Sequence, residues 1–241
     1  MGAANAQPET AGTCDPHAFK IAVDVGHTPE APGTTSARGV TEYVFNLRLA
    51  KEIAKALVDA GFDHVTLITM RGVGRPQLLA RTARANHLGV DLFLAVHHDD
   101  VQTVFHRNWT HEGKTYSYSD RNAGFSLFVS GTNTHLAEST AFAKLLGAAL
   151  IARGLQFTTH HAEDIAGEHR PWIDPNLGIY RYDELVVLKD TTAPAVLLEA
   201  GVIVNRMEEL RLASPQRQQQ IAAAAVEATT QFCMMVANKR S

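Results

Sequence analysis

The sequence lacks several features that would point to particular classes of protein. Its apolar runs have the length of a β-strand, whereas a membrane-spanning helix needs about 20 consecutive apolar residues, so no segment is expected to cross a bilayer. Positive and negative charges nearly balance, with 22 lysines and arginines against 25 acidic residues. This balance gives no electrostatic reason to expect nucleic acid or an anionic membrane as a partner. Internal repeats, low-complexity tracts and long linkers are missing as well.

Cysteine is also scarce, because Cys14 and Cys233 are the only two. Neither has the spacing of a zinc finger. In an oxidising compartment the two thiols could form a disulfide that pins the N-terminal arm to the last helix. Two unpaired thiols are the alternative, and the sequence alone does not decide between them.

The 241 residues are 45% hydrophobic and 20% charged, which is ordinary for a globular protein with one sizeable core. Strand-like apolar runs alternate with stretches of helical periodicity. Strands are expected at 20–25, 65–69, 91–96, 125–129 and 195–199, and helices from 42, at 76–88, at 135–153 and around 221–235. This order predicts a single α/β domain from residue 20 to residue 237, with a largely parallel twisted sheet and helices on both faces.

Four residues with the chemistry of a hydrolytic site stand at the ends of these elements. His27 and His97 close two of the strand runs, Glu42 begins a helix, and Glu199 ends the last strand. The carboxyl ends of parallel strands share one edge of a sheet, so these side chains are expected to meet. Two histidines and a glutamate match an open catalytic zinc site, and the remaining Glu199 can act as its base. Taken singly, each residue could instead be a hydrogen-bonded or ion-paired structural residue.

Other polar residues lie near these ends. Asp99 is expected to orient a ligand histidine, with a surface loop acid as the alternative interpretation. His160 and His161 suggest a further metal pair, but adjacent residues on a strand point to opposite faces, so solvent-exposed loop histidines are expected instead.

The arrangement resembles the zinc-dependent N-acetylmuramoyl-L-alanine amidases of the amidase 3 family, which cut peptide stems from bacterial cell-wall glycan. The resemblance runs from about Lys20 to Phe232. It is carried by short segments in the family's order: Asp24-Val25-Gly26-His27, Pro32-Gly33, Glu42 with Asn46-Leu47, Leu78 to Arg81, Ala85-Asn86, His97, Asp99, Val187-Leu188-Lys189, Pro194 to Gly201, and Asn205.

The chain departs from the family at two places. Thr28-Pro29-Glu30-Ala31 replaces the glycine-rich stretch that usually follows the first histidine, and His98 stands where relatives usually carry a small residue. Neither change removes a predicted ligand. Arg81, Asn86 and Asn205 match family positions and are expected to be structural.

The resemblance implies a reaction and a set of partners. One Zn²⁺ held by His27, Glu42 and His97 would assist hydrolysis of the amide between N-acetylmuramic acid and L-alanine, with Glu199 moving the proton. The substrate would be peptidoglycan or a muropeptide, and the protein a monomer. Two alternatives are a zinc peptidase or amidohydrolase acting on another amide, and a non-catalytic wall-binding module.

The resemblance also bears on regulation and location. The junction Gly131-Thr132-Asn133-Thr134 is too short for the blocking helix of some division amidases, so no activator protein is expected. The alternative is that Glu163, Asp164 or Glu168 folds over the zinc and blocks it instead. Segments 101–124 and 160–182 look irregular and longer than their family counterparts, and are expected to shape the groove. Ala4-Asn5-Ala6 before Gln7 resembles a signal-cleavage site, which makes residues 1–19 an arm with a remnant of an export signal and the protein periplasmic or secreted. A disordered tail is the alternative.

Overall fold

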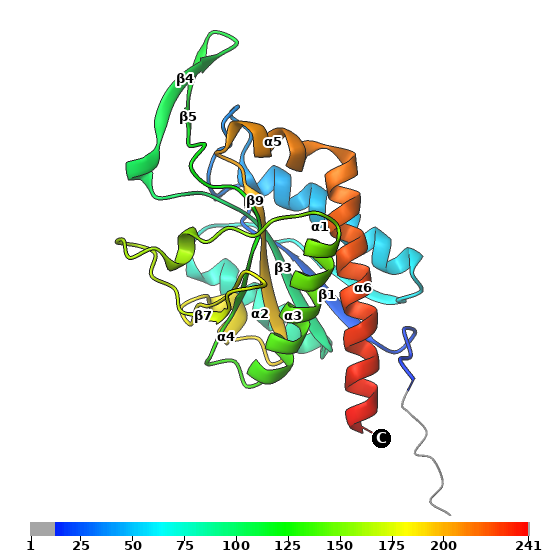
Figure 1. The fold of residues 1–241 in the computed structure, drawn as a ribbon. Coiled ribbons are helices and arrows are strands. Elements are labelled where there is room, and N and C mark those ends of the chain that lie inside the picture. Colours follow the sequence, from blue (N-terminus) through cyan, green and yellow to red (C-terminus); the bar gives the residue numbers. More distant parts are fainter. Residues whose placement is uncertain (1–12, 241) are drawn as a thin grey trace, which may run out of the picture.

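The computed structural model describes residues 13–240, without the side chain of Arg240. Its centre is a seven-stranded sheet with the strand order β2-β1-β3-β9-β6-β8-β7 (Figure 1). The strands of this sheet are β1 Lys20–Val25, β2 His64–Ile68, β3 Leu92–Asp99, β6 Ser126–Val129, β7 Trp172–Asp174, β8 Ile179–Arg181 and β9 Ala195–Val202. The predicted fold class, one α/β domain with a largely parallel sheet, is confirmed.

Pairing within the sheet fixes which loops meet at one edge. Strands β2, β1, β3 and β9 run parallel to one another, so their carboxyl ends lie together. Strand β6 runs antiparallel to β9 and parallel to β8, and β7 is antiparallel to β8. The edge with the carboxyl ends of β1, β3 and β9 therefore also receives the start of β6, where Ser126 pairs with Glu199.

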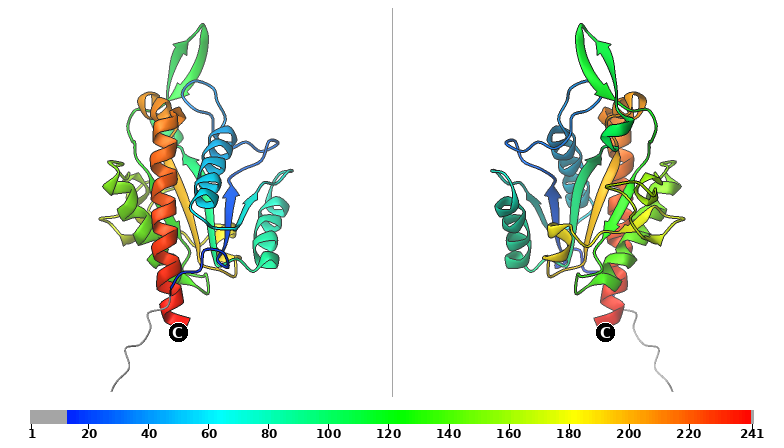
Figure 2. Two further views of the ribbon diagram at one scale, coloured as in Figure 1. Left: turned by 90° about the vertical axis from the view of Figure 1, so that its right-hand side faces the viewer. Right: turned by 90° about the vertical axis from the view of Figure 1, so that its left-hand side faces the viewer.

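Helices cover both faces of the sheet. On one face lie α1 Glu42–Asp59, α3 Leu136–Ala152 and α6 Pro215–Arg240, and on the other α2 Arg75–Leu88 and the short α4 Val186–Lys189 (Figures 1 and 2). Alternate residues of β3 divide between the two layers: Leu94 packs with the first group, and Phe93 with the second. A strand buried on both sides reads as a continuous apolar run, which is the pattern that the sequence shows.

Helix ends follow from local chemistry. Pro76 lies in the first turn of α2, where its missing N–H is not needed, and Gly89 ends the helix in a left-handed conformation with φ of 57°. The short helix α5, Arg206–Ala213, connects β9 to α6 and was not predicted. It begins at Asn205, whose side chain accepts hydrogen bonds from the backbone N–H groups of Met207 and Glu208.

The two segments predicted to be irregular contain secondary structure, so that expectation is wrong. Residues 101–124 include a hairpin, β4 Arg107–His111 and β5 Lys114–Tyr118, which projects from the body of the protein (Figures 1 and 2). Segment 160–182 includes a 3₁₀ turn at His160–Ala162 and strands β7 and β8, which extend the central sheet. These strands are too short to show a hydrophobic period in the sequence, which explains why the two segments look irregular there.

A disulfide joins Cys14 to Cys233 on α6, which decides the open question about these thiols in favour of pairing. Next to it, the ring of Phe19 packs edge-on against Phe62 and Phe232. The N-terminal segment from Cys14 onward is thus fastened to the helical layer by both a covalent bond and apolar contacts. Residues 4–7, in which a signal-cleavage site was predicted, lie outside the described residues. Among the described helices, not one combines the length and apolar character needed to cross a bilayer.

Candidate active site

The carboxyl edge of the sheet brings three predicted ligands together. His27 follows β1, His97 lies near the end of β3, and Glu42 is the first residue of α1. Glu42 faces both histidines: its Oε2 atom lies 2.9 Å from His27 Nε2, and its Oε1 atom 3.1 Å from His97 Nδ1. One ligand atom from each residue lies within 4.8 Å of the others. The juxtaposition expected from strand order is therefore present.

Two glycines leave the space that this cluster occupies. A Cβ atom added to Gly26 would lie 2.4 Å from the ring of His97, and one added to Gly33 would lie 2.2 Å from Glu42 Oε2. Gly33 also has a φ of 76°, which favours glycine. His27 itself has a φ of 65°, an uncommon conformation for a residue with a side chain. The backbone is thus shaped around the three side chains, whose imidazole nitrogens and carboxylate are ligand types that zinc binds.

Hydrogen bonds fix the orientation and charge of Glu42. Its Oε1 atom accepts from Asn46 Nδ2 at 3.0 Å and from the backbone N–H of His98 at 3.3 Å. Burial opposes the charged form of Glu42, but the bonds from His27 and His97 outweigh it and hold the pKa of the carboxyl well below its usual range. Glu42 is therefore an anion at neutral pH, as a metal ligand must be.

His98, which departs from the family pattern, supports the position of Glu42 through Asn46. Its Nδ1 atom lies 2.8 Å from Asn46 Oδ1, so His98 and Glu42 hold the two ends of one amide. Burial lowers the pKa of His98 to about 3, so its ring is neutral. The side chain is a packing and hydrogen-bonding residue.

Glu199 lies next to this cluster on strand β9, where it pairs in register with His97 of β3. Its Oε2 atom is buried and forms no hydrogen bond with any residue in 13–240. Burial, with the charges of Asp99 and Glu42 acting in the same direction, raises the pKa of Glu199 well above its usual range. A raised pKa makes the carboxylate of Glu199 a stronger base, which is the property that a group accepting a proton from water needs.

A pocket of about 260 Å³ opens beside Glu199. Residues from the end of β3 and from the 160–182 segment line it, among them Asp99, Gln102, Glu168, Arg170 and Tyr182. The 160–182 segment therefore forms a wall of the candidate substrate site, as its length suggested.

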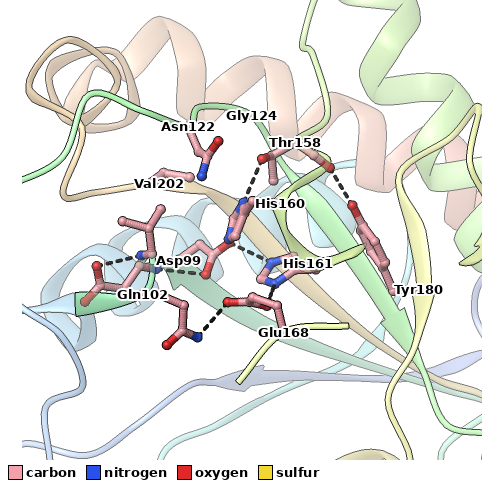
Figure 3. A network of polar contacts seen from close by, with 12 residues as sticks. Asp99, Gln102, Asn122, Gly124, Thr158, His160, His161, Glu168, Tyr180 and Val202 are labelled. Carbon is pink, nitrogen blue, oxygen red and sulfur yellow. Dashed lines mark hydrogen bonds and ion pairs between the residues drawn. The ribbon is translucent and has the colours of Figure 1, made fainter. Parts of the chain in front are cut away.

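Asp99, His160 and His161 form a second cluster at this edge (Figure 3). The histidines are 2% and 8% exposed, so the expectation that they are solvent-exposed is wrong. They lie in a 3₁₀ turn and not in a strand, so their side chains are about 120° apart around the axis instead of on opposite faces, and both contact Asp99. Asp99 was expected to orient a ligand histidine or lie on a surface loop; it is buried and contacts histidines, but these are His160 and His161 rather than His27 or His97.

The remaining family positions have structural contacts, as expected. The guanidinium of Arg81 is buried, pairs with Asp24 at 2.9 Å and donates to the backbone carbonyl of His27. Asn86 bonds the backbone of the loop after α4, and Asn205 caps α5. Thr158 and Glu168 hydrogen-bond to the second cluster. Sequence reasoning missed Thr158 and considered Glu168 only as an acid that could cover the zinc, because only the folded loop brings the two residues to this cluster.

Comparison with known proteins agrees with this geometry. The sequence profile of the amidase 3 family, described as N-acetylmuramoyl-L-alanine amidase, matches residues 21–231. The chain belongs to this amidase family. Among curated protein sequences, the comparison returned no match.

Solved structures of amidases share the fold. Ami1 from Mycobacterium smegmatis is 21% identical with a TM-score of 0.67, and the match covers 90% of this chain and 97% of that one. An N-acetylmuramoyl-L-alanine amidase from Clostridium difficile 630 is 18% identical, with a TM-score of 0.65 and the same coverage. The catalytic domain of CwlV from Bacillus (Paenibacillus) polymyxa var. colistinus is 22% identical, with a TM-score of 0.64, over 89% of this chain and 97% of that one.

Proposed function

We propose that this member of the amidase family is a zinc-dependent hydrolase that cleaves the amide between N-acetylmuramic acid and L-alanine in peptidoglycan. The observation that carries the proposal is the convergence of His27, Glu42 and His97, with Glu199 on the strand beside them. Family membership supports the choice of amide.

In this proposal His27, Glu42 and His97 hold one Zn²⁺. The glycines that make room for the three side chains and the anionic state of Glu42 support this assignment. A zinc ion bound there supplies Lewis acidity toward the scissile carbonyl and makes water more acidic. Asn46 and the backbone of His98 keep the Glu42 carboxylate turned toward the histidines, and Arg81 holds the backbone carbonyl of His27.

Glu199 moves the proton. Its carboxylate accepts a proton from the attacking water, whose oxygen forms the new bond to the carbonyl carbon. It then gives that proton to the departing alanine nitrogen as the carbon–nitrogen bond breaks. The buried Oε2 atom, which has no hydrogen-bond partner among the described residues, is suited to this task because no fixed neighbour competes for the proton.

We also propose where and with what the protein works. The substrate is peptidoglycan or a muropeptide bound in the pocket beside Glu199, and the disulfide supports a periplasmic or secreted location. The enzyme acts as a monomer without an activator. In support, the junction between β6 and α3 is a tight turn in which Asn133 donates to the carbonyls of Leu188 and Thr191.

The acids of the 160–182 segment make contacts away from the predicted zinc ligands. Glu163 pairs with Arg121, and Glu168 bonds His161. Neither acid contacts His27, Glu42 or His97 in these pairings, which supports a zinc site with one position left open for substrate.

A muropeptide digest with a mass-spectrometric readout tests the proposal. Purified enzyme should release stem peptides that begin with L-alanine, a chelator should stop the release, and added Zn²⁺ should restore it. Cleavage at another amide would favour a zinc peptidase, and binding to the wall without cleavage would favour a wall-binding module. Full activity in protein that elemental analysis shows to be metal-free would sink the proposal.

The role of Glu199 is tested by Glu199→Gln. The amide side chain has nearly the same volume but cannot accept the proton, so we expect kcat to fall about 10²–10⁴-fold while zinc stays bound. Glu163→Gln, a change of the same kind on the neighbouring loop, is the matched control and should keep full activity. Loss of zinc from Glu199→Gln, or an unchanged rate, would show that its role is assigned wrongly.

A further inference from the structure

The second cluster at the sheet edge has the composition of a cation site. His160, His161 and Asp99 each offer one ligand atom, and the three atoms lie within 4.8 Å of one another. Asp99 Oδ2 is 2.8 Å from His161 Nε2 and 3.3 Å from His160 Nε2. Ligand atoms around a tetrahedral zinc ion lie about 3.4 Å apart, given zinc–ligand distances of about 2.0–2.2 Å. To reach that spacing, Asp99 Oδ2 and His161 Nε2 would have to move apart by about 0.6 Å, whereas Asp99 Oδ2 and His160 Nε2 already lie close to it.

The outer nitrogen of each histidine is already held. His160 Nδ1 lies 2.7 Å from Thr158 Oγ1, and His161 Nδ1 lies 2.9 Å from Glu168 Oε2 (Figure 3). Metal-bound histidines almost always have such a partner on the other ring nitrogen, since it fixes the tautomer and the ring orientation. Both Nε2 atoms lie near the same carboxylate oxygen, Asp99 Oδ2, at 3.3 Å for His160 and 2.8 Å for His161.

The Nε2 atom of His160 is buried and has no hydrogen-bond partner among the described residues. His160 is 2% exposed, and its Nε2 atom makes no hydrogen bond with any residue in the described part of the chain, because its contact with Asp99 is not aligned for one. A buried polar atom without a partner is costly, and a bound ion is one of the ordinary ways in which proteins satisfy such an atom. The neighbouring carboxylates of Asp99, Glu168 and Glu199 all line one pocket, where a cation would offset their charge.

We propose that Asp99, His160 and His161 bind a second divalent transition-metal ion, Zn²⁺ or an ion of similar ligand preference, that clamps the 160–182 segment to the end of β3. Two imidazoles and a carboxylate select zinc and its neighbours over magnesium or calcium, which prefer oxygen ligands. Binding displaces the proton that His161 Nε2 shares with Asp99. The pocket leaves room for water as a further ligand. This site is separate from the zinc site of the proposed function.

Metal stoichiometry tests the proposal. The full chain is stripped with chelator, loaded with Zn²⁺, freed of excess metal and analysed for its elements, and two ions per chain are expected. His160→Gln should bind one. His160 is the informative position, because a purely structural network would rest on His161, which bonds both Asp99 and Glu168. The matched control is His169→Asn, an exposed histidine of the same segment with a φ of 67°, which asparagine tolerates. It should keep both ions.

Two further variants keep the test decisive. His27→Asn removes a ligand of the proposed catalytic zinc and should leave one ion, which His160→Gln in the same chain should abolish. Thr158→Val keeps the side-chain volume and alters no ligand, yet it removes the partner of His160 Nδ1. Competition with a chelating dye should show Zn²⁺ affinity at the second site weakened about 10–100-fold. This variant serves if His160→Gln does not fold.

The outcomes separate the two sites. One ion per wild-type chain that His160→Gln retains would overturn the second site and leave the proposed function standing. One ion that His160→Gln loses and His27→Asn keeps would support the second site and refute the zinc assignment in the proposed function. Unchanged affinity of both ions in Thr158→Val would also count against the second site.

Discussion

Loss of the Cys14–Cys233 disulfide should destabilise the protein by several kcal/mol. The bond closes a loop over a sequence separation of 219 residues, which is nearly the whole chain. In the chain-entropy model a loop of about this length removes about 18 cal/mol/K from the unfolded state, or about 5 kcal/mol at 25 °C. Measured values range from about 0 to 5 kcal/mol, so this figure is an upper bound. With an unfolding entropy of about 2.1 cal/mol/K per residue, it corresponds to a fall in Tm of about 10 °C.

Urea unfolding of oxidised and reduced wild-type protein measures this effect, because reduction keeps both sulfur atoms in place. The m value should rise on reduction, since the unfolded chain becomes less compact. The double variant Cys14→Ser, Cys233→Ala should behave like the reduced protein and should not respond to reductant. Cys233 lies in the main core. Any loss of stability in the variant beyond that of the reduced protein therefore measures the change in packing at this position. Equal unfolding midpoints for oxidised and reduced wild type would refute the reasoning.

Three other substitutions test contacts around the active site. Gly26→Ala should lower kcat/KM about 10²-fold or more, because its Cβ atom would lie 2.4 Å from the His97 ring and displace it; steady-state kinetics with a check of folding by circular dichroism measures this. Arg81→Met should cost about 3–5 kcal/mol in urea unfolding, because it leaves the carboxylate of Asp24 buried without its partner. Asn205→Ala should cost about 1 kcal/mol by the same assay through loss of the α5 cap, with activity retained.

The sequence predicts those helices and strands in which the hydrophobic pattern extends over many residues. The run expected at 91–96 is apolar from Leu92 onward, and it forms most of β3, a central strand covered on both faces. The helix expected at 135–153 is α3, Leu136–Ala152. Because the carboxyl ends of parallel strands share an edge, the meeting of His27 with His97 also follows from strand order. Glu42 joins them since α1 begins at that same edge.

The remaining features depend on contacts that no local pattern encodes. Strands β7 and β8 have three residues each, too few for a period to show, and their pairing with the sheet is a tertiary choice. The burial of His160 and His161 does not follow from the sequence, because adjacent side chains in a strand point to opposite faces, whereas the chain forms a 3₁₀ turn there. Thr158 and Glu168 become neighbours of these histidines only when the loop closes on β3.

One strand end supplies side chains to both clusters. His97 faces Glu42, and Asp99, two residues later, faces His160 and His161. A register shift between His97 and Asp99 interrupts their pairing with β9. Bulges of this kind re-aim side chains next to active sites. The regular part of β3 thus fixes His97 beside Glu199, while the irregular end turns Asp99 toward segment 160–182. Asp99 and Glu199 line the same pocket. The contacts that hold segment 160–182 against Asp99 therefore also set the charge in the pocket beside Glu199.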